Sequence, residues 1–126
     1  MRLKDTELLR TQCYIEGRWV DADGGATITV LNPATGRSIG TVPRAGAAET
    51  RRAIDAATAA FPAWARRTAK ERAAVLRRWY ELMMAHQDDL ATLMTAEQGK
   101  PLAESRGEVV YGASFIEWFA EEGKRI

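Results

Sequence analysis

The first third of the chain carries short groups of β-favouring residues separated by turn-forming residues. Tyr, Ile, Trp and Val side chains within residues 14–20 surround Gly17, a pattern that predicts two short strands joined by a tight turn. Residues 27–31 predict a further strand, the Asn-Pro-Ala-Thr-Gly segment at 32–36 a turn, and residues 38–42 the returning strand. The amino-terminal third is therefore expected to be built of short strands.

From Ala47 onward the apolar residues recur at helical spacing. Pro62 is expected to end the first helix at residue 60 or 61, because a proline disfavours the helical conformation of the residue before it. Thr68 and Glu71 have the spacing of a capping box, so a second helix is expected to begin there. Its apolar stripe spans about 120° and is expected to pack on a core. The stripe comprises Val75, Leu76, Trp79, Leu82 and Met83.

Two more helices complete the predicted chain. Asp88 and Asp89 favour the start of a third helix by their charge, and Gly99 is expected to end it as a left-handed cap. Pro101 suits the first position of a fourth helix, which is predicted to run to about residue 122.

The fourth helix has apolar residues on two nearly opposite faces, so two partners are expected. Gly107 and Gly112 each cost about 1 kcal/mol relative to alanine in a helix interior, which predicts close approach of another element. The spare aromatic face predicts a chain that continues into a longer protein, and a helix buried in a small bundle is the alternative. One face holds Leu102, Val109, Ala113, Ile116 and Ala120, and the other holds Tyr111, Phe115 and Trp118.

Composition limits the class of protein. The 126 residues are 46% apolar and 28% charged, which is typical of a soluble chain of at most one domain. No apolar run is long enough for a membrane span or a signal peptide, so a cytoplasmic location without membrane contact is expected. The net charge of +1 gives no field that would attract nucleic acid. The single cysteine, Cys13, excludes an internal disulfide and predicts a small packed side chain rather than a reactive thiol.

Motifs for chemistry are missing from the sequence. It contains no G-x-G-x-x-G, no G-x-x-x-x-G-K-[ST] and no H-E-x-x-H. His86 is expected near a helix end, where capping is favoured over general-base catalysis. The carboxylates Glu97, Glu104 and Glu108 are interpreted as surface groups. A basic cluster is interpreted as a solvated helix face rather than a nucleic-acid contact, and it comprises Arg66, Arg67, Lys70, Arg72, Arg77 and Arg78.

Ordered motifs along the whole chain resemble the opening of an aldehyde dehydrogenase. They are Tyr-Ile-Glu-Gly-Arg-Trp at 14–19, Asn-Pro-Ala-Thr-Gly at 32–36, Ile-Gly-Thr-Val-Pro at 39–43, Ala-Ile-Asp-Ala-Ala at 53–57, Phe-Pro-Ala-Trp at 61–64, the helix at 72–83, Glu-Gln-Gly-Lys-Pro-Leu-Ala-Glu at 97–104 and Phe-Ile-Glu-Trp-Phe-Ala-Glu-Glu-Gly-Lys-Arg-Ile at 115–126. The last two resemble the bacterial succinate-semialdehyde dehydrogenase branch in particular.

The resemblance implies an α/β fold, the outer amino-terminal part of a cofactor-binding domain. A few short strands (about 14–42) would precede four helices (about 47–122), with residues 1–12 as an arm and residues 13–126 as a partial aldehyde dehydrogenase domain. The family oxidises an aldehyde to the acid through a cysteine thioester, with NAD(P)+ as hydride acceptor. Its nucleophilic cysteine, oxyanion-stabilising asparagine, general-base glutamate and nucleotide-contacting lysine match no position here. The chain alone is thus expected to hold no catalytic or cofactor-binding residue and to be inactive.

Two weaker assignments also follow from the resemblance. Tyr111 and Phe115 correspond to a helix beside the substrate entrance, although packing against the rest of such an enzyme is the alternative. Glu97 and the Leu31 carbonyl match positions that hold a structural alkali cation in some relatives, with surface solvation as the alternative. The expected partner is the remainder of the enzyme, whose parent would form a homo-oligomer with no nucleic acid bound. The alternative function is an inert helical interaction module that self-associates through its aromatic last helix.

Overall fold

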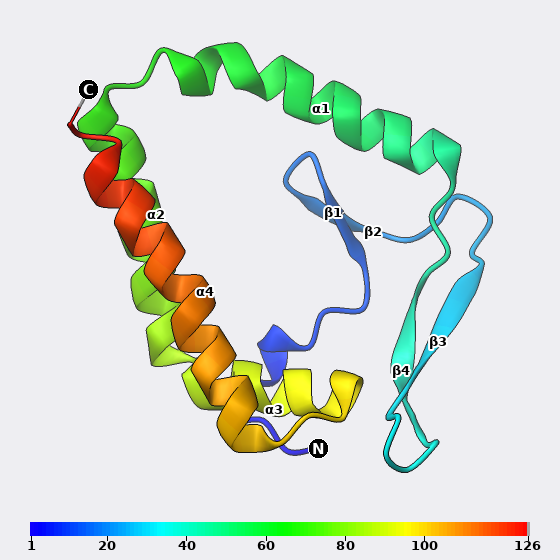
Figure 1. Ribbon diagram of the computed structural model, residues 1–126. Helices are drawn as coiled ribbons and strands as arrows, with labels where there is room; N and C mark the ends of the chain where they lie inside the picture. Colours follow the sequence, from blue (N-terminus) through cyan, green and yellow to red (C-terminus); the bar gives the residue numbers. More distant parts are fainter. Residues whose placement is uncertain (126) are drawn as a thin grey trace. The chain divides into compact units, whose positions relative to one another are not determined.

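The computed structural model describes residues 1–125 and confirms a mixed α/β chain of short strands followed by four helices (Figure 1). Close contacts divide it into two units, one formed by residues 9–66 and the other by residues 1–8 together with the chain from Arg67 onward. The elements are η1 (Thr6–Leu8), β1 (Cys13–Ile15), β2 (Arg18–Val20), β3 (Thr27–Leu31), β4 (Ser38–Pro43), α1 (Ala47–Ala65), α2 (Ala69–Ala85), α3 (Gln87–Gln98) and α4 (Leu102–Glu122).

The first hairpin of the 9–66 unit forms as the sequence predicts. Strands β1 and β2 are antiparallel, with Tyr14 opposite Trp19 and their ring centroids 5.0 Å apart. The turn residues Glu16 and Gly17 both have positive φ, 53° and 77°, which is the conformation that joins two strands with the right-handed twist. Glycine adopts this conformation without a steric penalty, which accounts for Gly17, whereas Glu16 adopts it against the usual preference of a non-glycine residue.

The second hairpin pairs β3 with β4 in antiparallel register, with an irregularity between Val30 and Leu31. Its connection is the predicted turn. The side-chain oxygen of Asn32 accepts hydrogen bonds from the backbone N–H groups of Ala34 and Thr35 at 2.9 and 3.2 Å. Gly36 completes the turn with a φ of 66°. Asparagine and glycine are suited to these roles, so the local sequence determines the connection.

Helix α1 begins where a buried carboxylate ties it to a preceding loop. Glu49 accepts hydrogen bonds from the backbone N–H groups of Asp23 and Gly46, each 2.9 Å long. The guanidinium of Arg52 donates two bonds of 2.7 Å to the Asp23 carboxylate. The glycine-rich loop before β3 is thereby fixed to the first turns of α1.

The predicted end of the first helix at residue 60 or 61 is wrong. Helix α1 continues through Pro62 to Ala65, and Arg66 N–H donates to the Pro62 carbonyl at 3.3 Å. A proline lacks the N–H that would bond one turn back, but only one intrahelical bond is lost this close to the helix end. The remaining turn therefore stays helical.

In the helical unit, the predicted starts and stops are mostly confirmed. The Thr68 backbone N–H donates to Glu71 at 2.8 Å and the Glu71 N–H donates to the Thr68 hydroxyl at 3.3 Å, a capping box at the start of α2. Gly99 ends α3 with a φ of 78°. Pro101 differs from the prediction because it is the residue before α4 rather than its first helical residue. Its extended ψ of 142° places it outside the helix.

The core of this unit is made of small side chains. Helix α4 lies along α2 and also contacts α3 (Figure 1). Its inner face buries Val109, Ala113 and Ala120 as the sequence predicts, whereas Ile116 is half-buried and Leu102, predicted on the same face, is exposed. Ser105 is fully buried as well, and its hydroxyl shares a 2.9 Å hydrogen bond with that of Thr95 on α3. Small residues allow the helix backbones to approach closely, and burial of the apolar ones stabilises the contact.

Two predictions about packing need correction. Gly112 is close to Met83, whose Cε would lie 3.9 Å from an added Cβ, but Gly107 has open space around it. Gly107 lies on an exposed part of α4, so no neighbour explains it. In α2, contact with α4 involves the side that carries the buried Ala73, so Val75, Trp79 and Leu82 of the predicted core stripe are exposed. Leu76 and Met83 are half-buried, which confirms only part of the stripe.

Candidate functional site

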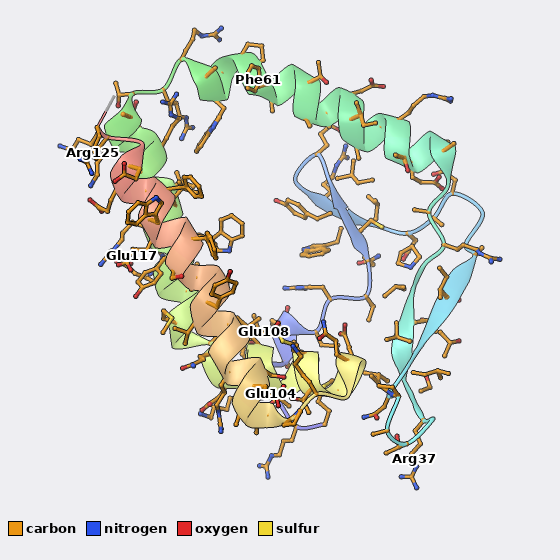
Figure 2. The ribbon with its side chains drawn as sticks, in the orientation of Figure 1. Arg37, Phe61, Glu104, Glu108, Glu117 and Arg125 are labelled. Carbon is orange, nitrogen blue, oxygen red and sulfur yellow. The ribbon has the colours of Figure 1, made fainter. Side chains whose placement is uncertain are left out.

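The outer face of α4 carries the sequence-predicted aromatic residues. We call Tyr111, Phe115 and Trp118 the aromatic face, and they are 66%, 47% and 61% exposed. Successive residues of a helix advance by about 100°, which places these three nearly opposite the buried Val109 and Ala113. Rings project from α4 along much of its length (Figure 2). The helix thus has one packed face and one open apolar face.

The two substrate-entrance candidates contact each other. The rings of Tyr111 and Phe115 meet edge to face, with centroids 4.9 Å apart and planes at 89°. This is the arrangement that aromatic quadrupoles favour. Phe119, one residue beyond Trp118, is also 60% exposed, so the open apolar surface extends toward the end of the helix. Exposed apolar patches of this kind mark interaction surfaces in proteins.

The candidate cation ligands are not brought together within one unit. Glu97 is exposed near the end of α3 in the helical unit, whereas Leu31 is the last residue of β3 in the 9–66 unit. Among residues 1–125 no group of three or more His, Cys, Asp and Glu side chains could hold a metal ion. The cation assignment stays a prediction.

The residues most often used for nucleophilic chemistry belong to different units. Cys13 is a half-buried free thiol in β1, and His86 connects α2 to α3 in the other unit. The His86 backbone continues both helices, since its N–H donates to Leu82 and its carbonyl accepts from Leu90, each at 3.0 Å. The predicted position of His86 at a helix end is confirmed, and its imidazole Nδ1 lies 4.0 Å from the Asp5 carboxylate.

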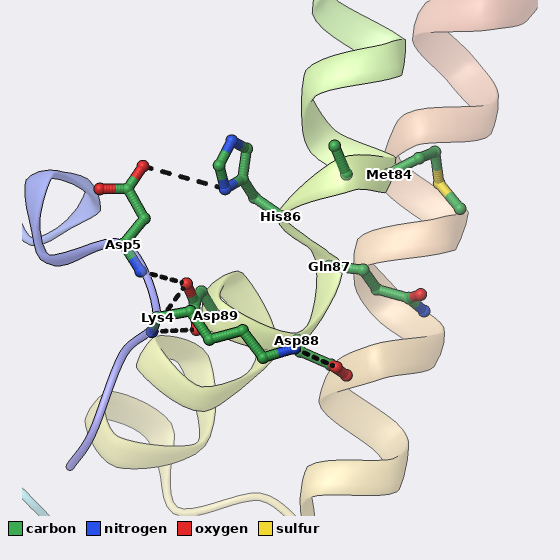
Figure 3. Close-up of a pocket in the computed structure, with 8 residues that line it drawn as sticks. Lys4, Asp5, Met84, His86, Gln87, Asp88 and Asp89 are labelled. Carbon is green, nitrogen blue, oxygen red and sulfur yellow. Dashed lines mark hydrogen bonds and ion pairs between the residues drawn. The ribbon is translucent and has the colours of Figure 1, made fainter.

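The cluster around His86 is a feature that the sequence pattern did not reveal. Figure 3 shows the Asp89 carboxylate of α3 hydrogen-bonded to the backbone of Lys4 and Asp5. These residues line a hollow of about 370 Å³. The Lys4 N–H donates to both Asp89 carboxylate oxygens at 3.0 and 3.1 Å, and the Asp5 N–H donates at 2.8 Å. These backbone donors hold the pKa of Asp89 below its usual value. The sequence pattern could not reveal this pairing because more than eighty residues separate the partners.

Asp88, the neighbouring carboxylate, binds side chains instead. The Arg106 Nε donates to it at 2.9 Å, and the Lys4 ammonium lies 3.5 Å away. Arg106 is the main cause of a lowered Asp88 pKa. Asp88 and Asp89 thus do more than favour a helix start, because each also has a partner distant in sequence.

The basic cluster is partly neutralised. Arg77 pairs with Glu117 of α4 at 2.7 Å and lies 3.5 Å from Glu81, which is also 3.9 Å from Arg78. Lys100 similarly pairs with Glu108. Because these carboxylates lie among the basic side chains, the surface carries charges of both signs rather than the continuous positive charge that favours nucleic-acid phosphates. Among the described residues no helix is long and apolar enough to cross a membrane.

Together these observations define a mixed α/β segment whose last helix offers an open aromatic face. The sequence model of the aldehyde dehydrogenase family matches residues 19–126, so the chain belongs to that family. Both the fold class and the family predicted from the sequence are confirmed.

Individual relatives match over the full chain. Glutarate-semialdehyde dehydrogenase of Pseudomonas putida is 69% identical over 100% of this chain and 26% of its own length. Succinate-semialdehyde dehydrogenase (NADP(+)) of Escherichia coli K12 is 64% identical with the same coverage. The crystal structure of an Escherichia coli NADP-dependent enzyme matches with a TM-score of 0.98 at 64% identity, covering 99% of this chain and 26% of that one.

The structural match extends to a second enzyme. The crystal structure of succinate-semialdehyde dehydrogenase from Burkholderia pseudomallei matches with a TM-score of 0.96 at 64% identity, covering 98% of this chain and 26% of that one. This chain spans about a quarter of the length of these relatives and corresponds to their amino-terminal part.

Proposed function

We propose that this chain supplies the amino-terminal part of an oxidoreductase that converts succinate semialdehyde, or a similar short semialdehyde, to the acid with NAD(P)+. The observation that carries the proposal is 64–69% identity over the whole chain to enzymes named for semialdehyde oxidation. The cysteine thioester step that the family resemblance implies would take place on residues outside this chain.

The nucleotide is proposed to bind outside this chain as well. A pyrophosphate typically binds at a helix amino terminus that follows a strand, where free N–H groups and the helix dipole favour an anion. Here the junction between β4 and α1 is already occupied by the Glu49 carboxylate, which accepts the N–H groups of Gly46 and Asp23. A second anion would meet like charge at that position. That junction therefore does not suit a pyrophosphate, and the short chain is proposed to bind no nucleotide and to be inactive.

The aromatic face is proposed to contact the remainder of the enzyme. Three exposed aromatic side chains on one side of a helix carry a large apolar area, and their burial against another domain would stabilise the assembly. The mutual contact of Tyr111 and Phe115 supports a place for these two at the substrate entrance, where a rigid apolar wall would guide a small aldehyde. A cytoplasmic location and a homo-oligomeric parent belong to the same proposal.

A hybrid enzyme tests this function. Residues 1–126 would replace the matching 26% of the Escherichia coli succinate-semialdehyde dehydrogenase, and NADPH formation would be followed with succinate semialdehyde and glutarate semialdehyde. We expect turnover by the hybrid and none by the short chain. A soluble, assembled hybrid without turnover would count against the proposal, and turnover by the short chain would show chemistry within residues 1–126.

A second function is favoured by the same exposed face. Two copies of the chain could bury their aromatic faces against each other and form an inert, self-associating helical module. Sedimentation distinguishes the two possibilities, because the module predicts a discrete dimer of the short chain that Trp118→Glu dissociates. The proposed enzyme part predicts no defined dimer.

A further inference from the structure

The first eight residues form a short segment, here called the N-terminal strap, that belongs to the helical unit. Its turn is locally organised, because the Asp5 side chain accepts the Glu7 N–H at 2.9 Å and the Asp5 carbonyl accepts the Leu8 N–H at 3.4 Å. Leu3 and Leu8 are half-buried. The strap is thus locally ordered by its own hydrogen bonds.

Asp89 makes the strongest attachment of the strap to the helices. Asp89 is a buried residue, 5% exposed, and its carboxylate accepts the backbone N–H groups of Lys4 and Asp5 over 2.8–3.1 Å. Hydrogen bonds to an ionised, shielded carboxylate are stronger than those between neutral groups.

Two further ion pairs of the strap are weaker. The ammonium of Lys4 lies 3.5 Å from Asp88, but the Lys4 side chain is 83% exposed, and ion pairs in such positions contribute little. The 4.0 Å approach of His86 to Asp5 is at the outer limit of an ion pair and depends on protonation of the imidazole. Neither contact would hold the strap as strongly as the backbone hydrogen bonds to Asp89 do.

We propose that Asp89 is a latch that holds the N-terminal strap on α3, and that opening this latch frees the strap while the helices stay folded. The chain runs directly from the strap into residues 9–66, which are joined again to the helical unit at Arg67. The latch therefore holds on the helical unit the eight residues that precede the 9–66 unit in the sequence.

Amide hydrogen exchange in the hybrid enzyme tests the latch. In Asp89→Asn the side-chain amide presents a donor where Asp89 accepts the Lys4 N–H, so we expect exchange at Lys4 and Asp5 to rise about tenfold or more. Exchange in α2 and α4 should stay unchanged. The matched control is Asp88→Asn, which removes the adjacent carboxylate but leaves the backbone bonds of the strap.

A second variant covers the case in which Asp89→Asn does not fold. Lys4→Pro removes the strap N–H that donates to both oxygens of Asp89 and leaves the sequence of α3 unchanged. The amide exchange rates of residues 5–8 should therefore rise by a similar factor. Unchanged strap exchange in either folded variant would overturn the latch, as would equal acceleration throughout the helices. The readout does not depend on turnover. An inactive hybrid whose strap responds as expected would reject the proposed function and leave the latch intact.

Discussion

Arg77 of α2 and Glu117 of α4 form a 2.7 Å ion pair that joins two neighbouring helices across a separation of forty residues. Both side chains are more than one-third exposed, so solvent screens their attraction. We expect Glu117→Gln to lower the melting temperature of the chain by a few degrees Celsius at most, with the difference vanishing in high salt. Circular dichroism at low and high salt measures this, with Asp55→Asn, at an exposed position in the middle of α1, as control. A large, salt-independent loss would contradict the assignment.

The small-residue core of the helical unit predicts a strong response to an added side chain. Ala113 is 0% exposed, so Ala113→Leu must displace a packed helix and should destabilise the unit by about 1–3 kcal/mol. Val110→Leu, on an exposed part of the same helix, should change stability by less than about 0.5 kcal/mol. Urea unfolding of both variants provides the comparison. Equal stabilities would show that α4 does not pack through Ala113.

The aromatic face predicts a different response in the short chain and in the hybrid enzyme. Trp118→Glu places a charge on that face, which should reduce binding of a hydrophobic dye to the short chain and reduce the yield of active hybrid several-fold. Gln98→Glu adds the same charge at an exposed polar position of α3. This control should change neither the dye binding of the short chain nor the yield of active hybrid. Full yield of the Trp118→Glu hybrid would show that this face is not covered in the enzyme.

The latch predicts a dependence on acid pH. The folded-state pKa of Asp89 is lowered, chiefly by the backbone N–H of Lys4 and then by that of Asp5, with the charges of Lys4 and His86 adding to the effect. A lowered pKa means that the stabilisation is fully present above the unfolded-state value, near pH 4, and is lost as pH falls through the folded-state value. The carboxylates of Asp5 and Asp88 line the same hollow, and the pKa of Asp88 is lowered as well, chiefly by Arg106.

Strap exchange measured between pH 6 and about pH 3 tests this dependence, with correction for the intrinsic effect of pH on exchange. We expect strap protection to decline only at the acid end in the unmodified hybrid and to be low throughout in Asp89→Asn. Protection that increases with acidity would contradict the assigned direction of the pKa shift.

Local signals in the sequence predicted much of the fold. The capping box of Thr68 and Glu71 and the tight turn at Gly17 depend on residues within a few positions of one another, so their chemistry is visible in the sequence. Pro62 shows the limit of local rules, because the loss of one hydrogen bond near a helix end does not stop the helix. Pro101 shows that a helix start can be misplaced by one residue.

Features that depend on distant partners were harder to predict. Periodicity identified an apolar stripe on α2, but it could not show that Trp79 is exposed while Ala73 faces the core. It also gave no sign that Asp89 binds the strap, since hydrogen bonds to backbone N–H groups leave no side-chain signature at Lys4 or Asp5. The aromatic face was predicted because its two opposite stripes lie within one helix.

The central claim is that these residues form the amino-terminal part of a semialdehyde-oxidising enzyme. The most direct measurement is NADP+-dependent oxidation of succinate semialdehyde by the hybrid, with the short chain assayed beside it. We predict a kcat/KM within about tenfold of the Escherichia coli relative for the hybrid, a difference of about 1.4 kcal/mol or less in transition-state stabilisation, and no turnover by the short chain. A folded, correctly assembled hybrid that oxidises neither succinate semialdehyde nor glutarate semialdehyde would contradict the account.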